Sequence, residues 1–406
     1  MMSTQPTFGR RLRQLRQQRG KTQADLAGPG MSAAYLSRLE SGTRPPTERA
    51  LAYLAERLNV QISDFQTTEP TDLVDVLATV LVSGGEDTRS ERYQLEEALN
   101  HAKPVDPALR WQAYAQLSKL MSAQGDRGAE LDVVETLTSL SDELGHATLQ
   151  LHSRLRLARC LRALGQAERA RAVALEALEL AARAALANRE TVRCQLLLAS
   201  ATAELGDLAE AARLSSEICE ELATATGTLA AEAYWTAATV ATRQGHHARS
   251  AELLERALAA LDSRDDLTLW MRLRLAAAAL ALQALPPDLT KAENYLDQVR
   301  PALDLIGEPL HVQEYTFLRA QLAYAQGDLD RASTLCEQTQ QANSKLTFRD
   351  GVRLRMLQLQ VRTSQGDPAA ISELQSLASE VHSCGMLDLA AEVWRAAAES
   401  RAPGGR

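Results

Sequence analysis

The chain has few aromatic side chains for its length: 4 Phe, 4 Trp and 8 Tyr among 406 residues, or 4%. Alanine and leucine instead supply most of its 45% hydrophobic content. Sandwiches and barrels of β-strands favour aromatic and β-branched residues, so this composition argues against them and in favour of helices. We therefore expect an all-α protein, with room for two or three domains of roughly 100–200 residues each.

Cysteine and long apolar runs are also scarce. The five cysteines lie far apart and include no CxxC pair, which argues against a disulfide scaffold and a zinc finger. The longest apolar run, residues 275–282, falls far short of the roughly 18 residues that cross a bilayer. The polar N-terminus lacks the apolar core of a secretion signal. We expect a cytoplasmic protein with no membrane contact.

Motifs of catalysis are missing as well. The sequence contains no GxGxxG, P-loop, GxSxG or HExxH pattern. The pair His246-His247 has no Cys or carboxylate partner at ligand spacing, and Asp265-Asp266 is interpreted as a loop between repeats. We predict no catalytic residues, no metal, no cofactor and no enzymatic activity.

Charge is distributed unevenly along the chain. The net charge of −8 is the sum of +4 on residues 1–70, with ten basic and six acidic side chains, and −12 on the remaining 336 residues, with 34 basic and 46 acidic ones. A small basic head on a large acidic body is typical of a modular protein that touches a polyanion at one end.

Signals for helix ends are dense in the first 66 residues. Thr7 is predicted to cap a helix over 8–19 that Gly20 ends, and Thr22 a short helix over 23–27. After a turn at 28–30, Ser32 caps a third helix over 33–40, and Thr47 starts a fourth. Two short capped helices joined by a tight glycine turn predict a helix-turn-helix.

Residues 22–46, TQADLAGPGMSAAYLSRLESGTRPP, resemble the Cro/C1-type (XRE) family of helix-turn-helix domains. The resemblance covers about residues 8–66 and implies a five-helix lambda-repressor-like DNA-binding domain at 1–66. There are two departures from the family pattern. Only Gly28 and Pro29 separate the Leu-Ala pair from the turn glycine, and Lys21 replaces an apolar residue. The matching positions are Arg16, Thr22, Gln23, Leu26, Ala27, Gly30, Met31, Ser32, Leu36, Ser37, Leu39, Glu40, Gly42 and Pro46.

The resemblance implies that the third helix enters the major groove of double-stranded operator DNA. Arg38 would then donate two hydrogen bonds to a guanine, and an alanine would pack on a thymine methyl. The base-contact candidates are Ser32, Ala33, Ala34, Ser37 and Arg38, and the backbone-contact candidates are Arg10, Lys21, Thr22, Gln23, Thr43 and Arg44. Arg16 and Glu40 are expected to form an internal ion pair, as in the family.

Residues 67–90 are predicted to be a linker that contains one apolar helix. The polar segment 66–71 and the glycine-containing segment 83–90 flank a very apolar stretch at 72–82. A helix this apolar must pack on something, either the body of the protein or a second subunit.

From about residue 91 the chain repeats at intervals of 39 to 42 residues, marked by turns at Gly125, Gly165, Gly206, Gly245, Gly327 and Gly366, with Pro287 in place of a missing glycine. Small residues stand seven positions before and five after most turns, where two helices would cross. This pattern resembles the tetratricopeptide repeat (TPR), with a period longer than the usual 34 or so. We predict a right-handed TPR-like α-solenoid over 91–406, with about seven hairpins and a final helix at 386–400. HEAT-like helix pairs are the alternative.

Counting back from each turn places a set of first-helix residues on the concave face. Arginines and aromatic rings there suit an extended peptide with an acidic group or a free carboxylate. The alternative is that these side chains are solvated or pair within the chain, Arg193 with Glu232 and Arg353 with Glu314. The candidate ligand-binding residues are Arg159, Arg162, Arg193, Trp235, Thr239, Arg274, Phe317, Gln321, Tyr324 and Arg353.

A helix-turn-helix head on a TPR-like body resembles the peptide-pheromone-receptor regulators of Gram-positive bacteria. The resemblance implies a DNA-binding transcriptional regulator and quorum-sensing receptor that acts as a homodimer joined through the repeats, with a signalling peptide in the repeat groove. Two alternatives stay open. In one, a protein partner takes the place of the peptide; in the other, the chain is a scaffold whose head binds protein.

Overall fold

The computed structural model describes residues 5–28, 31–41, 43–65, 72–83, 88–101, 105–186, 189–341 and 345–400. These residues form α-helices and one 3₁₀ turn and contain no β-strand, so the all-α prediction is confirmed. The chain divides into two compact units, residues 1–86 with 93–105, and residues 87–92 with 106–406. The domain boundaries expected at residues 66 and 90 remain predictions.

The first unit begins with a small helical domain. Its apolar centre includes Phe8, Leu36 and Leu54, and the rings of Phe8 and Phe65 lie 5.8 Å apart. Because α1 starts before Thr7, that residue lies within the helix and does not cap it, which corrects the prediction. The elements are α1 (Gln5–Gln18), α2 (Gln23–Leu26), α3 (Ala33–Glu40), α4 (Glu48–Leu58) and the 3₁₀ turn η1 (Ile62–Phe65).

Hydroxyl caps start three of these helices as predicted. The side chain of Thr22 accepts a hydrogen bond from Asp25 N, and the Asp25 carboxylate accepts one from the Thr22 backbone N–H, which completes a capping box. Ser32 accepts from Tyr35 N at 3.1 Å, and Thr47 plays the same role at α4. These local bonds fix where the two helices of the motif begin.

Helix α5 (Leu73–Ser83) confirms the apolar helix predicted at 72–82. Its side chains at Leu73, Val76, Leu77 and Val80 are buried, whereas Val82 is 87% exposed, so one apolar edge of the helix is uncovered. Helix α6 (Thr88–His101) follows it.

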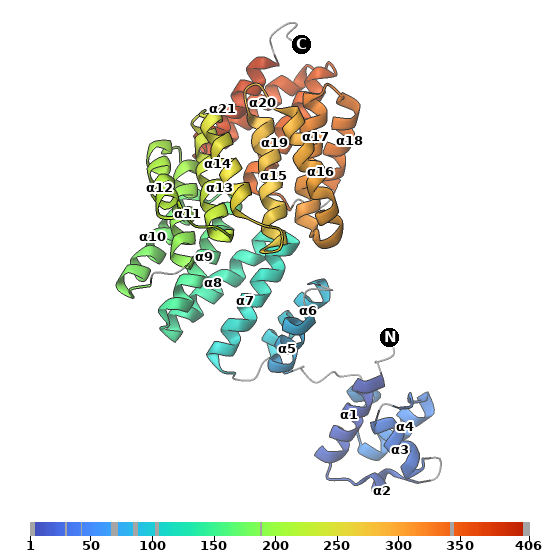
Figure 1. The fold of residues 1–406 in the computed structure, drawn as a ribbon. Helices are drawn as coiled ribbons and strands as arrows, with labels where there is room; N and C mark the ends of the chain where they lie inside the picture. Colours follow the sequence, from blue (N-terminus) through green and yellow to red (C-terminus); the bar gives the residue numbers. More distant parts are fainter. Residues whose placement is uncertain are drawn as a thin grey trace. The chain divides into compact units, whose positions relative to one another are not determined.

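The described residues of the second unit form seven helical hairpins and a final helix, as predicted, and Figure 1 shows them stacked in chain order. The hairpins are α7 (Pro107–Gln124) with α8 (Arg127–Leu144), α9 (Ala147–Ala163) with α10 (Ala167–Arg183), α11 (Arg189–Glu204) with α12 (Leu208–Glu221), α13 (Thr228–Arg243) with α14 (His247–Ala260), α15 (Leu267–Gln283) with α16 (Leu289–Ile306), α17 (Pro309–Ala325) with α18 (Leu329–Gln341), and α19 (Phe348–Ser364) with α20 (Ala369–Ser383); α21 (Leu387–Glu399) ends the unit.

Small residues sit where the helices of a hairpin cross. Ala158 on α9 and Ala170 on α10 are both fully buried, and a larger side chain at either position would push the helices apart. Gly165 joins these helices with a φ of +80°, a conformation that side chains with a Cβ rarely adopt. The sequence signal for the repeat therefore has a direct packing cause.

The turn between α15 and α16, which lacks a glycine, has five residues, whereas four of the other six hairpin turns have three. Most first helices end two residues before the turn glycine, as α13 does before Gly245. Helix α15 ends at Gln283, so the matching position is Leu285 and not Pro287. Positions counted back from Pro287 are consequently displaced by two residues along α15.

The second unit closes on itself at its last hairpin. Lys345 Nζ donates a hydrogen bond to the backbone oxygen of Gln124, although the two residues are 221 positions apart. A Cβ built on Gly165 would lie 2.7 Å from the Phe348 ring. The segment that leads into α19 thus packs against the turns of the first two hairpins.

Candidate nucleic-acid interface and ligand site

Helix α3 presents one polar side to solvent. Leu36 and Leu39 are fully buried and anchor the helix in the domain core. The residues predicted to meet bases are all exposed, namely Ser32, Ala33, Ala34, Ser37 and Arg38. Their common exposure is what insertion of this helix into a major groove requires.

Arg38 stands at the end of this exposed side. Its backbone oxygen accepts hydrogen bonds from Thr43 N at 3.0 Å, Thr43 Oγ1 at 3.1 Å and Ser41 Oγ at 3.2 Å. Among the described residues, the guanidinium makes one hydrogen bond, from Nε to Ala34 O at 3.2 Å, within its own helix. The backbone at Arg38 is therefore fixed, while the terminal nitrogens remain available for an acceptor.

Arg44 is held beside α3 by an aromatic ring. Its guanidinium carbon lies 5.0 Å from the centre of the Tyr35 ring, a cation–π distance. Tyr35 is partly buried against the domain core. Arg44 is thus positioned at the edge of the exposed side of α3.

Three of the residues predicted to contact the DNA backbone lie near α2 and also make hydrogen bonds within the domain. Lys21 Nζ donates to the backbone oxygen of Arg57, and Thr22 caps α2. Gln23 Nε2 donates to Glu40 Oε2 at 2.7 Å, and its second N–H and its oxygen have no such partner within the described residues. The side chain of Arg10 lies outside what the structure describes.

The ion pair expected between Arg16 and Glu40 is confirmed. Arg16 Nε lies 2.7 Å from Glu40 Oε1, and the two side chains are 12% and 5% exposed. The hydrogen bond to Glu40 raises the pKa of Arg16. Because Gln23 bonds the same carboxylate, Glu40 ties α1, α2 and α3 together.

The shortened turn of the motif is described at its two ends. Gly28 and Met31 exchange two backbone hydrogen bonds of 3.0 Å each, and Pro29 and Gly30 lie outside the described residues. A Cβ at Gly28 would lie 2.7 Å from the Tyr53 hydroxyl and 2.9 Å from an Arg57 nitrogen. A glycine at this position allows α2 and α4 to approach.

In the second unit, three predicted ligand-binding arginines are paired within the chain. Arg162 Nε lies 2.9 Å from Glu204 Oε1. Arg193 Nε lies 2.8 Å from Glu232 Oε2, which confirms the pairing considered as an alternative for this residue. Arg353 pairs with Glu392 at 3.0 Å, not with Glu314 as that alternative supposed.

Two further candidates do not lie where the sequence placed them. Arg274 lies 3.6 Å from the centre of the Trp270 ring and donates to Gln298 at 3.0 Å, so it faces the second helix of its own hairpin. Because the turn after α15 is two residues longer, Arg272 and not Arg274 stands at the position that the sequence analysis counted toward the concave face. Phe317 is 3% exposed and packs in the core beside Ala320, which leaves no ring surface for a ligand.

The other candidates are accessible in part. Trp235, Thr239, Gln321 and Tyr324 are half-buried, and Thr239 Oγ1 donates to Trp235 O at 3.0 Å within the helix. Arg159 is exposed, but burial by the surrounding protein lowers its pKa to about 10.

A buried charge cluster escaped the sequence analysis. Glu204 Oε1 lies 2.9 Å from Arg162 and 3.4 Å from Arg243, and Asp388 lies 2.6 Å from Arg349 and 3.7 Å from Arg243. Burial alone would raise the pKa of Glu204, but the arginines around it more than offset this and lower it. The sequence contains one signal for this cluster: Glu204 and Arg243 are opposite charges at equivalent positions of neighbouring hairpins, each two residues before a turn glycine.

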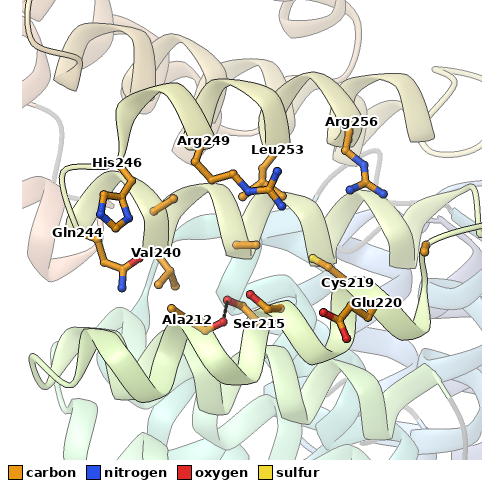
Figure 2. Close-up of a pocket in the computed structure, with 14 residues that line it drawn as sticks. Ala212, Ser215, Cys219, Glu220, Val240, Gln244, His246, Arg249, Leu253 and Arg256 are labelled. Carbon is orange, nitrogen blue, oxygen red and sulfur yellow. Dashed lines mark hydrogen bonds between the residues drawn. The ribbon is translucent and has the colours of Figure 1, made fainter.

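The pocket in Figure 2 is lined by residues of α12, α13 and α14 and has a volume of about 230 Å³. Its arginines already have partners: Arg256 donates to the Tyr234 hydroxyl at 2.6 Å, and Arg249 pairs with Glu252 at 3.0 Å. Over the described ranges no cluster of His, Cys, Asp and Glu can hold a metal ion, and no helix there is long and apolar enough to cross a membrane.

Residues 7–65 match the family model of a helix-turn-helix domain. Over 102 residues the chain is 37% identical to the HTH-type transcriptional regulator PrpR of Mycobacterium tuberculosis, a match of 25% of this chain and 21% of PrpR. The chain thus matches about a fifth of that relative's length. The family match and this relative agree with the helix-turn-helix domain predicted in the first 66 residues.

Two solved structures resemble most of the chain. One is the Rap protein complexed with competence and sporulation factor, with a TM-score of 0.55, 12% identity and 97% coverage of both chains. The other is NprR in complex with its cognate peptide NprX, with a TM-score of 0.55, 14% identity, and coverage of 86% of this chain and 96% of NprR. At such identities the likeness shows the fold, and it agrees with the predicted TPR-like repeat.

Proposed function

We propose that the chain is a transcriptional regulator that binds double-stranded DNA through α3. The observation that carries this proposal is the exposed row on α3, from Ser32 to Arg38, in a helix-turn-helix domain. Arg38 is suited to bond a guanine in two places, and Arg44 to meet a phosphate nearby. The positive charge of the first 70 residues supplies the attraction to the DNA backbone.

Selection of fragments from the source genome with the purified protein tests this proposal. We expect a selected fragment to be retarded by the wild type, and Arg38→Ala to weaken binding by about 1–3 kcal/mol with relaxed preference at one base. Arg213→Ala is the matched control, because Arg213 is exposed on α12 and pairs with Glu210 at 2.6 Å. Failure to retard any fragment at about 100 mM salt would contradict the proposal.

The second unit, in this proposal, is a receptor for a signalling peptide. The support is a set of arginines and half-buried aromatic residues on the first helices of its hairpins, together with the fold it shares with NprR, a protein solved with its cognate peptide. A peptide that favours one curvature of the repeats would change the affinity of the head for DNA, limited by its differential affinity for the two curvatures.

The regulator is further proposed to act as a homodimer in the cytoplasm, where its operator would be. Two heads would then meet half-sites about one helical turn, roughly 34 Å, apart. The uncovered edge of α5, with Leu81 at 59% and Val82 at 87% exposure, is consistent with a surface covered in a dimer. Sedimentation of the wild type and of Val82→Glu measures the oligomeric state, and a monomeric wild type bound to its operator would contradict this part.

A further inference from the structure

The backbone of Arg44 is fixed close to the last turn of α3. Arg44 N donates a hydrogen bond of 3.3 Å to the backbone oxygen of Arg38, which also accepts one from Thr43 N. The hydroxyl oxygens of Ser41 and Thr43 lie 3.0 Å apart and close the same turn. Pro45 follows Arg44 and disfavours a helical backbone at it. The segment after α3 therefore returns Arg44 to the helix that it has just left.

The side chain of Arg44 keeps its full charge. Arg44 forms no ion pair and no side-chain hydrogen bond with any residue that the structure describes, whereas Arg16 of the same domain pairs with Glu40 at 2.7 Å. Arg44 is also exposed to solvent. An exposed arginine has many rotamers, and fixing one of them when a ligand binds costs free energy.

The ring of Tyr35 restrains this side chain. The guanidinium carbon of Arg44 lies 5.0 Å from the centre of the ring, within the roughly 6 Å over which a cation is attracted to an aromatic face. Tyr35 is half-buried and packs against the domain core, so the ring is itself held in place. The Tyr35 hydroxyl makes no hydrogen bond among the described residues, which leaves the ring face as the part of Tyr35 that acts on Arg44.

A ring restrains an arginine without neutralising it. A carboxylate in the same place would form an ion pair and occupy N–H donors, as Glu40 does with two nitrogens of Arg16. The face of a ring attracts the cation but accepts no such pair of hydrogen bonds. The guanidinium of Arg44 thus keeps its charge and its donors for an acceptor such as a phosphate oxygen.

We propose that Tyr35 is a positioning residue for DNA binding. Its ring holds the guanidinium of Arg44 beside the exposed side of α3, so that Arg44 meets a phosphate with less loss of rotamer freedom. Tyr35 acts through Arg44 and not through a contact of its own with the DNA. This inference rests on the proposed DNA-binding function and adds a residue that is not among the predicted DNA contacts.

Retardation of a genomic fragment selected with the wild type tests the role of Tyr35. Arg44→Ala is expected to weaken binding several-fold and to lower the dependence of log affinity on log salt by about one, as loss of one phosphate contact does. Tyr35→Leu keeps an apolar side chain against the core but removes the ring, and is expected to weaken binding roughly twofold to fivefold. Tyr35→Phe keeps the ring and is expected to bind as the wild type does. In the Arg44→Ala background, Tyr35→Leu is expected to cause no further loss.

Tyr53→Leu is the matched control. Tyr53 forms a second pair of this kind in the same domain, with its ring centre 5.6 Å from the guanidinium carbon of Arg57. Its ring also packs against the domain core. The effect of Tyr53→Leu on affinity is expected to be the same in the wild type and in the Arg44→Ala background, because Tyr53 restrains a different arginine. Circular dichroism checks that every variant is folded.

Three results would overturn the positioning role and leave DNA binding standing. They are unchanged binding by Arg44→Ala, equal losses for Tyr35→Leu and Tyr35→Phe, and a loss from Tyr35→Leu that is as large in the Arg44→Ala background as in the wild type. Failure of the wild type to retard any fragment contradicts the DNA-binding function, and the role of Tyr35 with it.

Discussion

Arg349 donates two hydrogen bonds to Asp388, of 3.2 Å and 2.6 Å, across 39 residues of sequence. Arg243, from a much earlier hairpin, approaches the same carboxylate at 3.7 Å. The side chains of the two arginines and of Asp388 are 8%, 11% and 15% exposed. Asp388 therefore links the end of the repeat unit to its middle through buried charges.

Replacement of Asp388 is expected to weaken this closure. Asp388→Asn removes the ion-pair partner of the buried Arg349, while Arg243 keeps Glu204 at 3.4 Å. Loss of one partner of a buried pair costs roughly 3–5 kcal/mol. Urea unfolding followed by circular dichroism measures the effect as a lower midpoint for the repeat unit. Asp262→Asn is the control, because its partner Arg264 is 87% exposed, and exposed pairs contribute only about 0–1 kcal/mol. Equal midpoints for the two variants would contradict the assignment of a closing contact.

The contact of Gly165 with Phe348 gives a second measure of the same closure. Gly165→Ala meets two penalties, the φ of +80° and a Cβ at 2.7 Å from the Phe348 ring. Gly245→Ala has nearly the same φ, +79°, but nothing lies within 4 Å of its Cβ. We expect about 1–2 kcal/mol of destabilisation for Gly245→Ala from the backbone alone, and a larger loss for Gly165→Ala. Equal losses, measured by thermal unfolding, would show that the ring contact is absent in solution.

Local signals in the sequence were sufficient for the head domain and for the hairpins. The caps at Thr22 and Ser32 and the pair of Arg16 with Glu40 follow from residues close in the chain or fixed by the motif. The crossings at Ala158 and Ala170 follow from the repeat period. Each of these features depends on spacing that the sequence displays directly.

Contacts between hairpins that are far apart in the sequence could not be predicted in this way. Lys345 meets Gln124 across 221 residues, and the repeat period does not encode how far successive hairpins rotate. Arg274 was misplaced for a different reason, since two additional turn residues shifted the count along α15, and Arg272 stands at the position that corresponds to Arg193 and Glu232. Phe317 was misplaced because its helix packs against neighbours on more than one side, so a ring at that position enters the core.

Glu314 is predicted to make stability depend on pH near neutrality. Burial, together with the negative charge of Asp350, raises its pKa from 4.5 to about 7. Between these values the unfolded chain releases the proton while the folded chain retains it, so stability falls as the pH rises from about 4.5 to 7. Glu314→Gln removes this loss, and its advantage in melting temperature over the wild type is expected to grow from pH 5 to pH 8. Parallel curves for the two proteins would contradict the raised pKa.

Gln23 links the start of α2 to the end of α3 through its 2.7 Å hydrogen bond to Glu40. Gln23→Glu replaces the donor with a carboxylate, which places two negative groups against the single cation of Arg16. We expect faster hydrogen exchange in α2 and α3 and roughly tenfold weaker retardation of a selected DNA fragment. Gln17→Glu adds the same charge at an exposed position of α1 and is expected to leave exchange in α2 and α3 unchanged. If both variants weaken DNA binding equally while exchange stays unchanged, repulsion between the added charge and the phosphates accounts for the loss, and Gln23 has no positioning role in the domain.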